Sequence, residues 1–380
     1  MNYDPTRAQQ RFLDELERFI VQELNPQLTP DQRDAPFNRG AWQRCADEGL
    51  LRWRVPTAQG GLGLDLSTAV LGYEAFGKYC SDVSFSYAFS AHSWSLMTAL
   101  IEFADDAQQR YLQDVMSGGR IGAFAMTEAD AGSDTAAIQS RAVRDGDEYV
   151  LNGSKAYITL APVADFTLVF ASTDPSRGAW GISAFLVDRD APGVHAGDPD
   201  AKIGLAGAPL GPLTLTDCRV PASARVGAEG SGTSIFAHIM ELERAFILAF
   251  TLGIMSRQLD SAVDYARTRH QFGQPIGKLQ SVANRIVAMK TRLELARLLV
   301  YKVAWLKEQN RPAQLESAMA KAYLAEAFTE SSLDALKTRG AAGYLESAGI
   351  GDELMTAVAG LLYGGTTDIQ RVVVARCLGL

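Results

Sequence analysis

The chain has 380 residues, of which 47% are hydrophobic and 21% charged, as in an ordinary globular protein with material for two or three domains. Its formal net charge of −8 argues against nucleic-acid binding as its main role. The four cysteines stand far apart without a C-x-x-C pair, and the N-terminal stretch is charged, unlike a signal peptide. We therefore expect a cytoplasmic protein without a disulfide framework, and the longest apolar run, Ala245–Met255, is too short to span a membrane.

Three zones follow one another along the chain. Residues 1–118 are expected to form a helical domain, because apolar residues such as Leu13 and Leu16 recur at helical spacing. Residues 119–231 contain short β-branched and aromatic runs separated by Asp-Gly and Asn-Gly turn signals, which predicts an antiparallel β domain. Long helical patterns return in residues 232–380. We therefore predict an α+β protein with the order helical, β, helical.

Neither a metal site nor a nucleotide phosphate loop is predicted. His92, His195, His238 and His270 lie far apart and show no metal-ligand spacing, so each is expected to be an ordinary buried or surface histidine. The stretch GQPIGK, Gly273–Lys278, has too few spacer residues for a phosphate loop, and no predicted strand precedes it.

The stretch FAMTEADAGSD, Phe124–Asp134, is the most informative part of the chain. A predicted strand ends here in a loop of small residues that carries hydroxyls at Thr127 and Ser133. Small side chains let a planar ligand approach the backbone, whose N–H groups can then hydrogen-bond it. A β-turn with capping polar groups explains the same residues, so their chemistry alone leaves both interpretations open.

Together with NGSKAYIT at residues 152–159, this loop resembles the acyl-CoA dehydrogenase family, in which T-E-x-x-A-G-S-D is followed by N-G-x-K-x-Y/W-I-T. Further family landmarks occur in order over essentially the whole chain. They are VPTAQGGLGLD at residues 55–65, DCRVP at 217–221, RTRHQFGQPIGKLQ at 267–280 and GTTDIQRVVVAR at 365–376. The resemblance implies FAD as cofactor, a C-terminal domain built as a four-helix bundle, and a homotetramer.

The resemblance also implies where the cofactor would lie. Thr127 and Thr159 would hydrogen-bond the flavin edge, and Tyr157 would lie against the ring. Arg269 and Phe272 would reach the FAD of a neighbouring subunit. The complete implied cofactor-binding set is Phe124, Met126, Thr127, Gly132, Ser133, Tyr157, Thr159, Arg269, Phe272, Lys337, Gly340, Ala341, Thr366 and Asp368.

Three segments depart from the family pattern. Residues 337–341 read KTRGA where the family often has Q-x-x-G-G, and residues 202–208 lack the Arg and Ser of K-x-G-x-R-x-S. The third departure is Gly364, in LLYGGTTDIQR, which holds the place of the glutamate that is the base in the best-known members. Either the protein is not a dehydrogenase, or another carboxylate takes the proton.

Glu243, in IMELERAFILAF, is the candidate for that base. On a helix its neighbours three and four residues away are all apolar, whereas Glu241 is expected to pair with Arg244 at the surface. A carboxylate in an apolar pocket has a raised pKa and is the stronger base. The pattern alone favours a glutamate that reaches solvent or a distant arginine. The resemblance reverses this, because some members, such as isovaleryl-CoA dehydrogenase, carry the base in the L-E-R that stands here as Leu242-Glu243-Arg244. Asp368 is the reserve candidate.

The C-terminal segment also resembles a branch of the family that oxidises acyl or aminoacyl groups, including prolyl groups, on carrier proteins in natural-product biosynthesis. That branch has a small residue in the place of Gly364 and its glutamate on the earlier helix. By this resemblance Arg244, Ser133 and Gly364 would contact the acyl thioester. Two alternatives stay open: a branched-chain acyl-CoA dehydrogenase of catabolism, and a flavoprotein without dehydrogenase activity. An electron-transfer flavoprotein or dioxygen is the expected electron acceptor.

Overall fold

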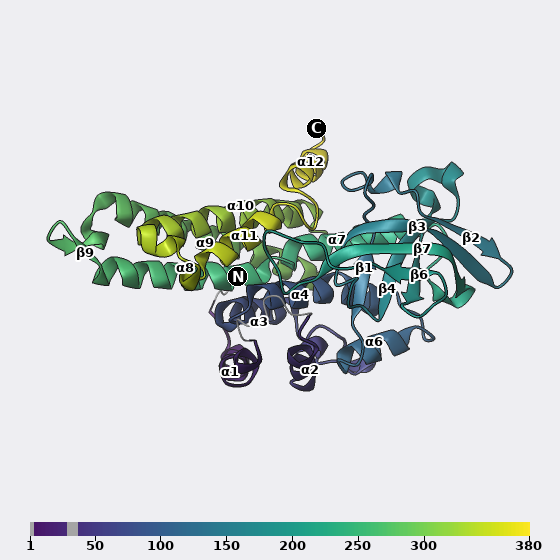
Figure 1. The fold of residues 1–380 in the computed structure, drawn as a ribbon, viewed down its shortest axis with the longest axis horizontal. Helices are drawn as coiled ribbons and strands as arrows, with labels where there is room; N and C mark the ends of the chain where they lie inside the picture. Colours follow the sequence, from purple (N-terminus) through teal and green to yellow (C-terminus); the bar gives the residue numbers. More distant parts are fainter. Residues whose placement is uncertain (1–3, 29–36) are drawn as a thin grey trace.

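The computed structural model describes residues 4–28 and 37–380, which form three parts in chain order (Figure 1). The first part is helical. Its first helix begins at Thr6, whose side chain accepts a hydrogen bond from the Gln9 N–H while the Gln9 side chain bonds back to the Thr6 N–H. The N-terminal helices are α1 (Arg7–Phe19), α2 (Arg39–Asp47), α3 (Leu66–Tyr79), α4 (Val83–Trp94), α5 (Leu96–Phe103) and α6 (Gln109–Met116).

The middle part is one sheet. Its strands are β1 (Gly122–Ala125), β2 (Arg141–Asp145), β3 (Glu148–Thr159), β4 (Phe166–Ser172), β5 (Ile182–Asp188), β6 (Val194–Ala196), β7 (Leu210–Pro221) and β8 (Arg225–Val226). They lie in the order β6-β7-β3-β2-β4-β5-β8, with β1 beside β4. Most neighbours are antiparallel as predicted, but β1 and β4 run parallel, as do β2 and β4 at a single residue pair, so the sheet is mixed. The β2–β3 hairpin separates β1 from β4 in the chain, and only such a longer connection permits parallel pairing.

Strand β4 is buried on both faces and joins the two cores of the protein. Its alternate residues point to opposite sides of the sheet. Phe166, Leu168 and Phe170 pack into the large core shared with the helical parts, while Val169 and Ala171 pack into the smaller core of the β part. The face of the sheet that carries the candidate site is therefore fixed against the helices by apolar contacts.

The third part is again helical, with a small hairpin at one end. Its elements are α7 (Gly232–Phe246), α8 (Ala249–Thr268), β9 (His270–Gln271), β10 (Gln274–Pro275), α9 (Gln280–Glu308), α10 (Gln314–Arg339), α11 (Ile350–Gly360) and α12 (Thr367–Cys377). Helix α10 contacts all the other helices of this part. Figure 1 shows the long bundle with the β part at one end and the β9–β10 hairpin at the other, while α12 stands where bundle and β part meet.

Two details of the chain determine the geometry of the candidate site. Ser95 separates α4 from α5 with a backbone conformation of φ −96° and ψ −81°, which lies outside the helical region. The hydroxyl of Ser90 donates to the Ile247 carbonyl at 2.8 Å, so α4 is tied to the α7–α8 junction.

Within the described ranges, no helix is both long enough and apolar enough to span a membrane. All four cysteines are free.

Candidate active site

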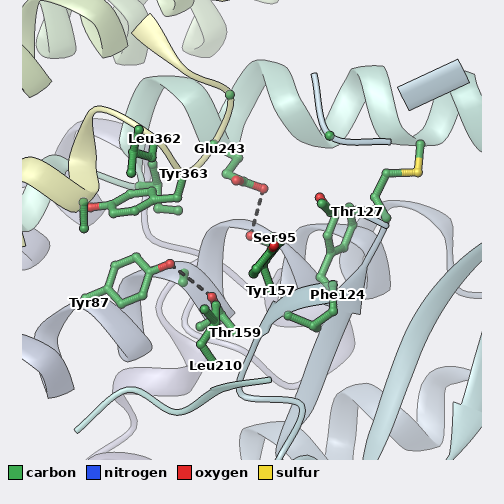
Figure 2. Close-up of a pocket in the computed structure, with 18 of the residues that line it drawn as sticks. Tyr87, Ser95, Phe124, Thr127, Tyr157, Thr159, Leu210, Glu243, Leu362 and Tyr363 are labelled. Carbon is green, nitrogen blue, oxygen red and sulfur yellow. Dashed lines mark hydrogen bonds between the residues drawn. The ribbon is translucent and has the colours of Figure 1, made fainter. Parts of the chain in front are cut away.

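A cavity of about 770 Å³ opens where the sheet meets the two helical parts. It is lined by α4, by β1 and the loop after it, by the end of β3, and by α7 and the segment from α11 to α12. Figure 2 shows side chains from these elements converging on one space. Eleven predicted site residues line it: Phe124, Met126, Thr127, Gly132, Ser133, Tyr157, Thr159, Glu243, Arg244, Gly364 and Thr366.

The loop after β1 is held by a buried ion pair that the sequence reasoning missed. Lys155 of β3 donates to the Glu128 carboxylate at 2.8 Å and to the Met126 carbonyl at 3.1 Å. The Ser140 hydroxyl and N–H and the Gln139 N–H also donate to Glu128. Burial alone would raise the pKa of Glu128, but these donors outweigh it and lower the pKa below its ordinary value. Glu128 of TEADAGSD and Lys155 of NGSKAYIT thus connect the two motifs. One motif follows the other in the family pattern, and this order could have suggested the contact.

The end of β3 presents Tyr157 and Thr159 to the cavity. The sheet register between β3 and β7 shifts after Lys155, and Tyr157 takes a left-handed conformation with φ +58°. Its side chain is 63% exposed, which leaves a large aromatic face without protein cover. The Thr159 hydroxyl lies 3.1 Å from the Tyr87 hydroxyl of α4 (Figure 2).

Glu243 of α7 is 6% exposed and lies in the cavity wall. The Ser95 hydroxyl donates to its carboxylate at 2.8 Å (Figure 2). Burial raises the pKa of Glu243 above its ordinary value, more than this hydrogen bond and the nearby cations Arg244 and Lys321 lower it. The apolar surroundings expected from the helical spacing are present. A cation from another helix also lies nearby, but it is Lys321 of α10 and not the expected arginine.

Arg244 faces the cavity as a partly desolvated cation. Burial lowers its pKa, while Glu243 opposes the change. The predicted surface pair between Glu241 and Arg244 is wrong: Glu241 bonds Lys307 at 3.1 Å and the Ala313 N–H at 3.0 Å. Helical spacing could not reveal this, because the better partners come from α9 and the segment that follows it.

Gly364 lies directly beside the Glu243 carboxylate. Its φ is +64°, and a Cβ placed there would be 3.5 Å from Glu243 Oε1 and 3.9 Å from Lys321 Cε. The position at which other family members were expected to carry the base therefore borders the carboxylate that this chain presents from α7.

The remaining predicted cofactor residues lie away from the cavity within one chain. Arg269 and Phe272 belong to the β9–β10 hairpin region at the far end of the bundle (Figure 1), where Phe272 is 89% exposed. Lys337, Gly340 and Ala341 are exposed at the end of α10, which meets the end of α8 through the Tyr265 hydroxyl and the Arg339 carbonyl. Their proposed role at a neighbouring subunit stays a prediction.

Asp368, the reserve base and a predicted cofactor contact, does not line the cavity. It lies in the first turn of α12, its side chain is 86% exposed, and it pairs with Arg371 at 3.0 Å. Asp368 therefore does not face the cavity into which Glu243 points. Of the histidines, His92 lines the cavity, where burial lowers its pKa to about 3 and keeps it neutral. In the described parts of the chain no cluster of three metal-ligating side chains occurs.

The cavity wall has polar atoms that a ligand would satisfy. Arg244 Nε and the Tyr363 hydroxyl are buried and have no hydrogen-bond partner among the described residues. The hydroxyls of Thr127 and Ser133 and the exposed Tyr157 ring lie on the opposite, β side. A large cavity with an aromatic face and several polar groups fits an extended, partly aromatic molecule.

The helical–β–helical order and the buried carboxylate in the cavity wall match the arrangement that the sequence resemblance led us to expect. The chain belongs to the acyl-CoA dehydrogenase family: residues 6–119, 123–218 and 230–379 match its N-terminal, middle and C-terminal domains. The predicted family and fold class are confirmed.

Several relatives match nearly the whole length of the chain. An L-prolyl-[peptidyl-carrier protein] dehydrogenase from Pseudomonas fluorescens is 38% identical over 383 residues, which cover 100% of this chain and 99% of that protein. The structure of the prolyl acyl carrier protein oxidase AnaB is 41% identical, with a TM-score of 0.96 over 99% of this chain and 100% of its own. PigA, solved with FAD and proline, is 34% identical, with a TM-score of 0.96 over 100% of both chains.

Proposed function

We propose that the protein is an FAD-dependent dehydrogenase of acyl thioesters with Glu243 as its general base. The observation that carries this proposal is the carboxylate itself: it is buried in the cavity wall, has a raised pKa, and borders Gly364. A base whose pKa is raised toward neutral pH takes a proton from carbon more readily than a solvated glutamate. The flavoprotein without dehydrogenase activity is disfavoured, because the carboxylate that Gly364 lacks is supplied from α7.

The residues on the β side of the cavity fit FAD. We assign Thr127 and Thr159 to the flavin edge and Tyr157 to the ring, since their hydroxyls and the uncovered aromatic face line one wall. The Glu128–Lys155 pair fixes the loop that carries Thr127, so these groups are held in place before the cofactor binds.

In the proposed reaction the substrate loses a proton from its α-carbon and a hydride from its β-carbon, and a double bond forms between the two carbons. The Glu243 carboxylate receives the proton and becomes neutral. Bound FAD supplies the hydride acceptor. Arg244 and Ser133 would contact the thioester, and Gly364 leaves room for the acyl group beside Glu243.

We propose a prolyl group on a carrier protein as the substrate. Support comes from the prolyl-carrier relatives that match the chain over its full length. The second candidate, a branched-chain acyl-CoA dehydrogenase, is favoured only by the position of the base, which both hypotheses share.

We also propose a cytoplasmic location, because a reducing compartment keeps the four free cysteines as thiols.

A neighbouring subunit is proposed to complete the cofactor site, within a homotetramer. Phe272 has a left-handed φ of +53° and a nearly uncovered ring, which is unfavourable for an isolated surface aromatic. Arg269, Lys337 and Gly340 lie exposed at the same end of the bundle. Replacing Arg269 by Ala should release FAD while leaving the cavity of each subunit intact, which absorbance of the purified protein and its mass in solution would measure.

The test of substrate class is anaerobic flavin reduction in a single turnover. The prolyl-loaded carrier protein should bleach the flavin, whereas free proline and branched acyl-CoA esters should not. Bleaching by acyl-CoA esters alone would overturn the carrier assignment. Electron-transfer flavoprotein and dioxygen, the two proposed acceptors, are then offered separately to the reduced enzyme, and the faster reoxidation identifies the acceptor.

The test of the base uses two carboxylates of one helix. Glu243→Gln should slow flavin reduction by about 10²- to 10⁴-fold, the usual contribution of a general base. Glu241→Gln is the matched control, because Glu241 lies outside the cavity and bonds Lys307 instead. Unchanged flavin reduction in Glu243→Gln would remove Glu243 from the mechanism.

A further inference from the structure

A second charged group lies next to the base but outside the cavity wall. Lys321 of α10 is 1% exposed and is not among the cavity-lining residues. Its Nζ donates to the Gly360 carbonyl at 3.0 Å, the one acceptor that the described residues give it. A buried ammonium group has three donors and is costly unless it is paired. The one hydrogen bond accounts for little of the stability that such a burial needs.

Gly364 borders both Lys321 and Glu243. A Cβ at this position would touch Glu243 Oε1 and Lys321 Cε at ordinary contact distances. No side chain therefore occupies the space that both groups border. The two opposite charges act on each other in this buried setting: Lys321 lowers the pKa of Glu243, although less than Arg244 does, and Glu243 raises the pKa of Lys321.

Other groups that face the carboxylate differ in kind. Arg244 is the second cation, but it lines the cavity, where substrate would change its surroundings. Tyr87 and Tyr363 also face Glu243; burial raises the pKa of Tyr87 to about 12 and that of Tyr363 well above its ordinary value. Both phenols stay neutral at physiological pH. Lys321, unlike Arg244, is not among the residues that line the cavity.

We propose that Lys321 is a positioning residue that holds Glu243 in its ionised, proton-accepting form from behind the cavity wall. The inference rests on the proposed role of Glu243 as base. Without a cation, burial would protonate a larger share of the Glu243 carboxyl before substrate arrives, and a protonated base takes no proton. Lys321 of α10 and the Ser95 hydroxyl, at the break between α4 and α5, act on the carboxylate from different parts of the chain.

Burial lowers the pKa of Lys321 to about 8, while the Glu243 charge raises it. The ammonium form therefore prevails at neutral pH and depends on the carboxylate. This mutual dependence is what a purely structural lysine, which only bonds the end of α11 through Gly360, would lack.

The test measures the pH dependence of single-turnover flavin reduction in Lys321→Met and Lys321→Arg. Loss of an opposite charge raises the pKa of the base, so the acidic limb should move to higher pH by about one unit in Lys321→Met. The conservative variant Lys321→Arg should return the limb toward that of the natural protein. Lys321→Gln, which keeps a donor for the Gly360 carbonyl without a charge, should behave like Lys321→Met and replaces it if the latter does not fold.

An infrared titration separates failure of this inference from failure of the proposed function. The protonated carboxyl of Glu243 is identified by the band that Glu243→Gln lacks, and its midpoint should rise in Lys321→Met even in enzyme that is not turning over. An unmoved midpoint and an unmoved acidic limb would overturn the role of Lys321. Full flavin reduction in Glu243→Gln would instead overturn the function of Glu243, whatever the titration shows.

Discussion

Glu128 in the β part and Glu243 in α7 are both buried carboxylates, yet their pKa values move in opposite directions. Glu128 receives four donors, including Lys155 at 2.8 Å, and its pKa is lowered. Among the described residues only the Ser95 hydroxyl donates to Glu243, and burial raises the pKa of this carboxyl. Burial alone therefore does not make a carboxylate a base. The hydrogen-bond donors determine the direction of the pKa shift, because each donor favours the ionised form.

The two carboxylates also differ in whether a part of the group is left open to the cavity. Glu128 is enclosed by protein groups that use up its acceptor capacity, so it holds a loop. Glu243 borders Gly364 and the cavity, so part of its surface is open to a substrate. A saturated carboxylate suits a structural role, and an under-saturated one next to a cavity suits proton transfer.

The largest expected effect comes from moving the open carboxylate. Glu243→Gly should slow flavin reduction by about 10²- to 10⁴-fold, since it removes the base. Adding Gly364→Glu should recover part of that loss, because a Cβ at 364 starts 3.5 Å from the present position of Glu243 Oε1. Recovery stays incomplete, since φ +64° costs a non-glycine residue about 1–2 kcal/mol. Single-turnover flavin reduction measures both variants, and a double variant no faster than Glu243→Gly would contradict the shared location.

The next largest effect is expected when Glu128 loses the cation that pairs with it. Lys155→Met leaves Glu128 buried without its cation, and removal of one partner of a buried pair costs about 3–5 kcal/mol. The free energy of unfolding in urea should fall by that amount. Arg219→Met, which removes an exposed partner of Glu148, is the control and should cost at most about 1 kcal/mol. Equal costs for the two variants would mean that the Lys155–Glu128 pair is not the structural support inferred here.

Much of this arrangement could be predicted from the sequence, and the exceptions share one cause. The motif that contains Thr127, the apolar neighbours of Glu243 and the change at Gly364 are local patterns, and the structure brings all three to one cavity. Ser95 and Lys321 could not be found, because the break between α4 and α5 and helix α10 meet Glu243 only through tertiary packing. The parallel pairing of β1 with β4 was missed for the same reason, since alternation along a strand does not reveal its partner.

The contrast also predicts opposite pH dependences of stability. The raised pKa of Glu243 means that the native state binds more protons than the unfolded state, so its contribution to stability is lost as pH rises from its ordinary value through the raised one. The lowered pKa of Glu128 has the opposite sign, and its contribution is lost as pH falls below the ordinary value. Urea unfolding across pH should therefore show Glu243→Gln gaining on the natural protein with rising pH, and Glu128→Gln losing. Parallel curves for the two variants would contradict the opposite shifts.

The smallest expected effect concerns the hydroxyl of Ser95, which donates to Glu243. Ser95→Ala removes the hydroxyl that donates to Glu243 at 2.8 Å, and this bond lowers the pKa of that carboxyl. A hydrogen bond to a charged group contributes about 1.5–3 kcal/mol, which corresponds to about one pKa unit at its lower end. The acidic limb of the pH profile for flavin reduction should thus move to higher pH by about one unit, with the rate above it little changed. Ser90→Ala is the matched control, because Ser90, in the helix α4 that ends just before Ser95, bonds the Ile247 carbonyl instead. A limb that moves equally in both variants would show that α4 acts through packing, whereas a shift confined to Ser95→Ala would show that one hydroxyl helps keep the base of this site ionised.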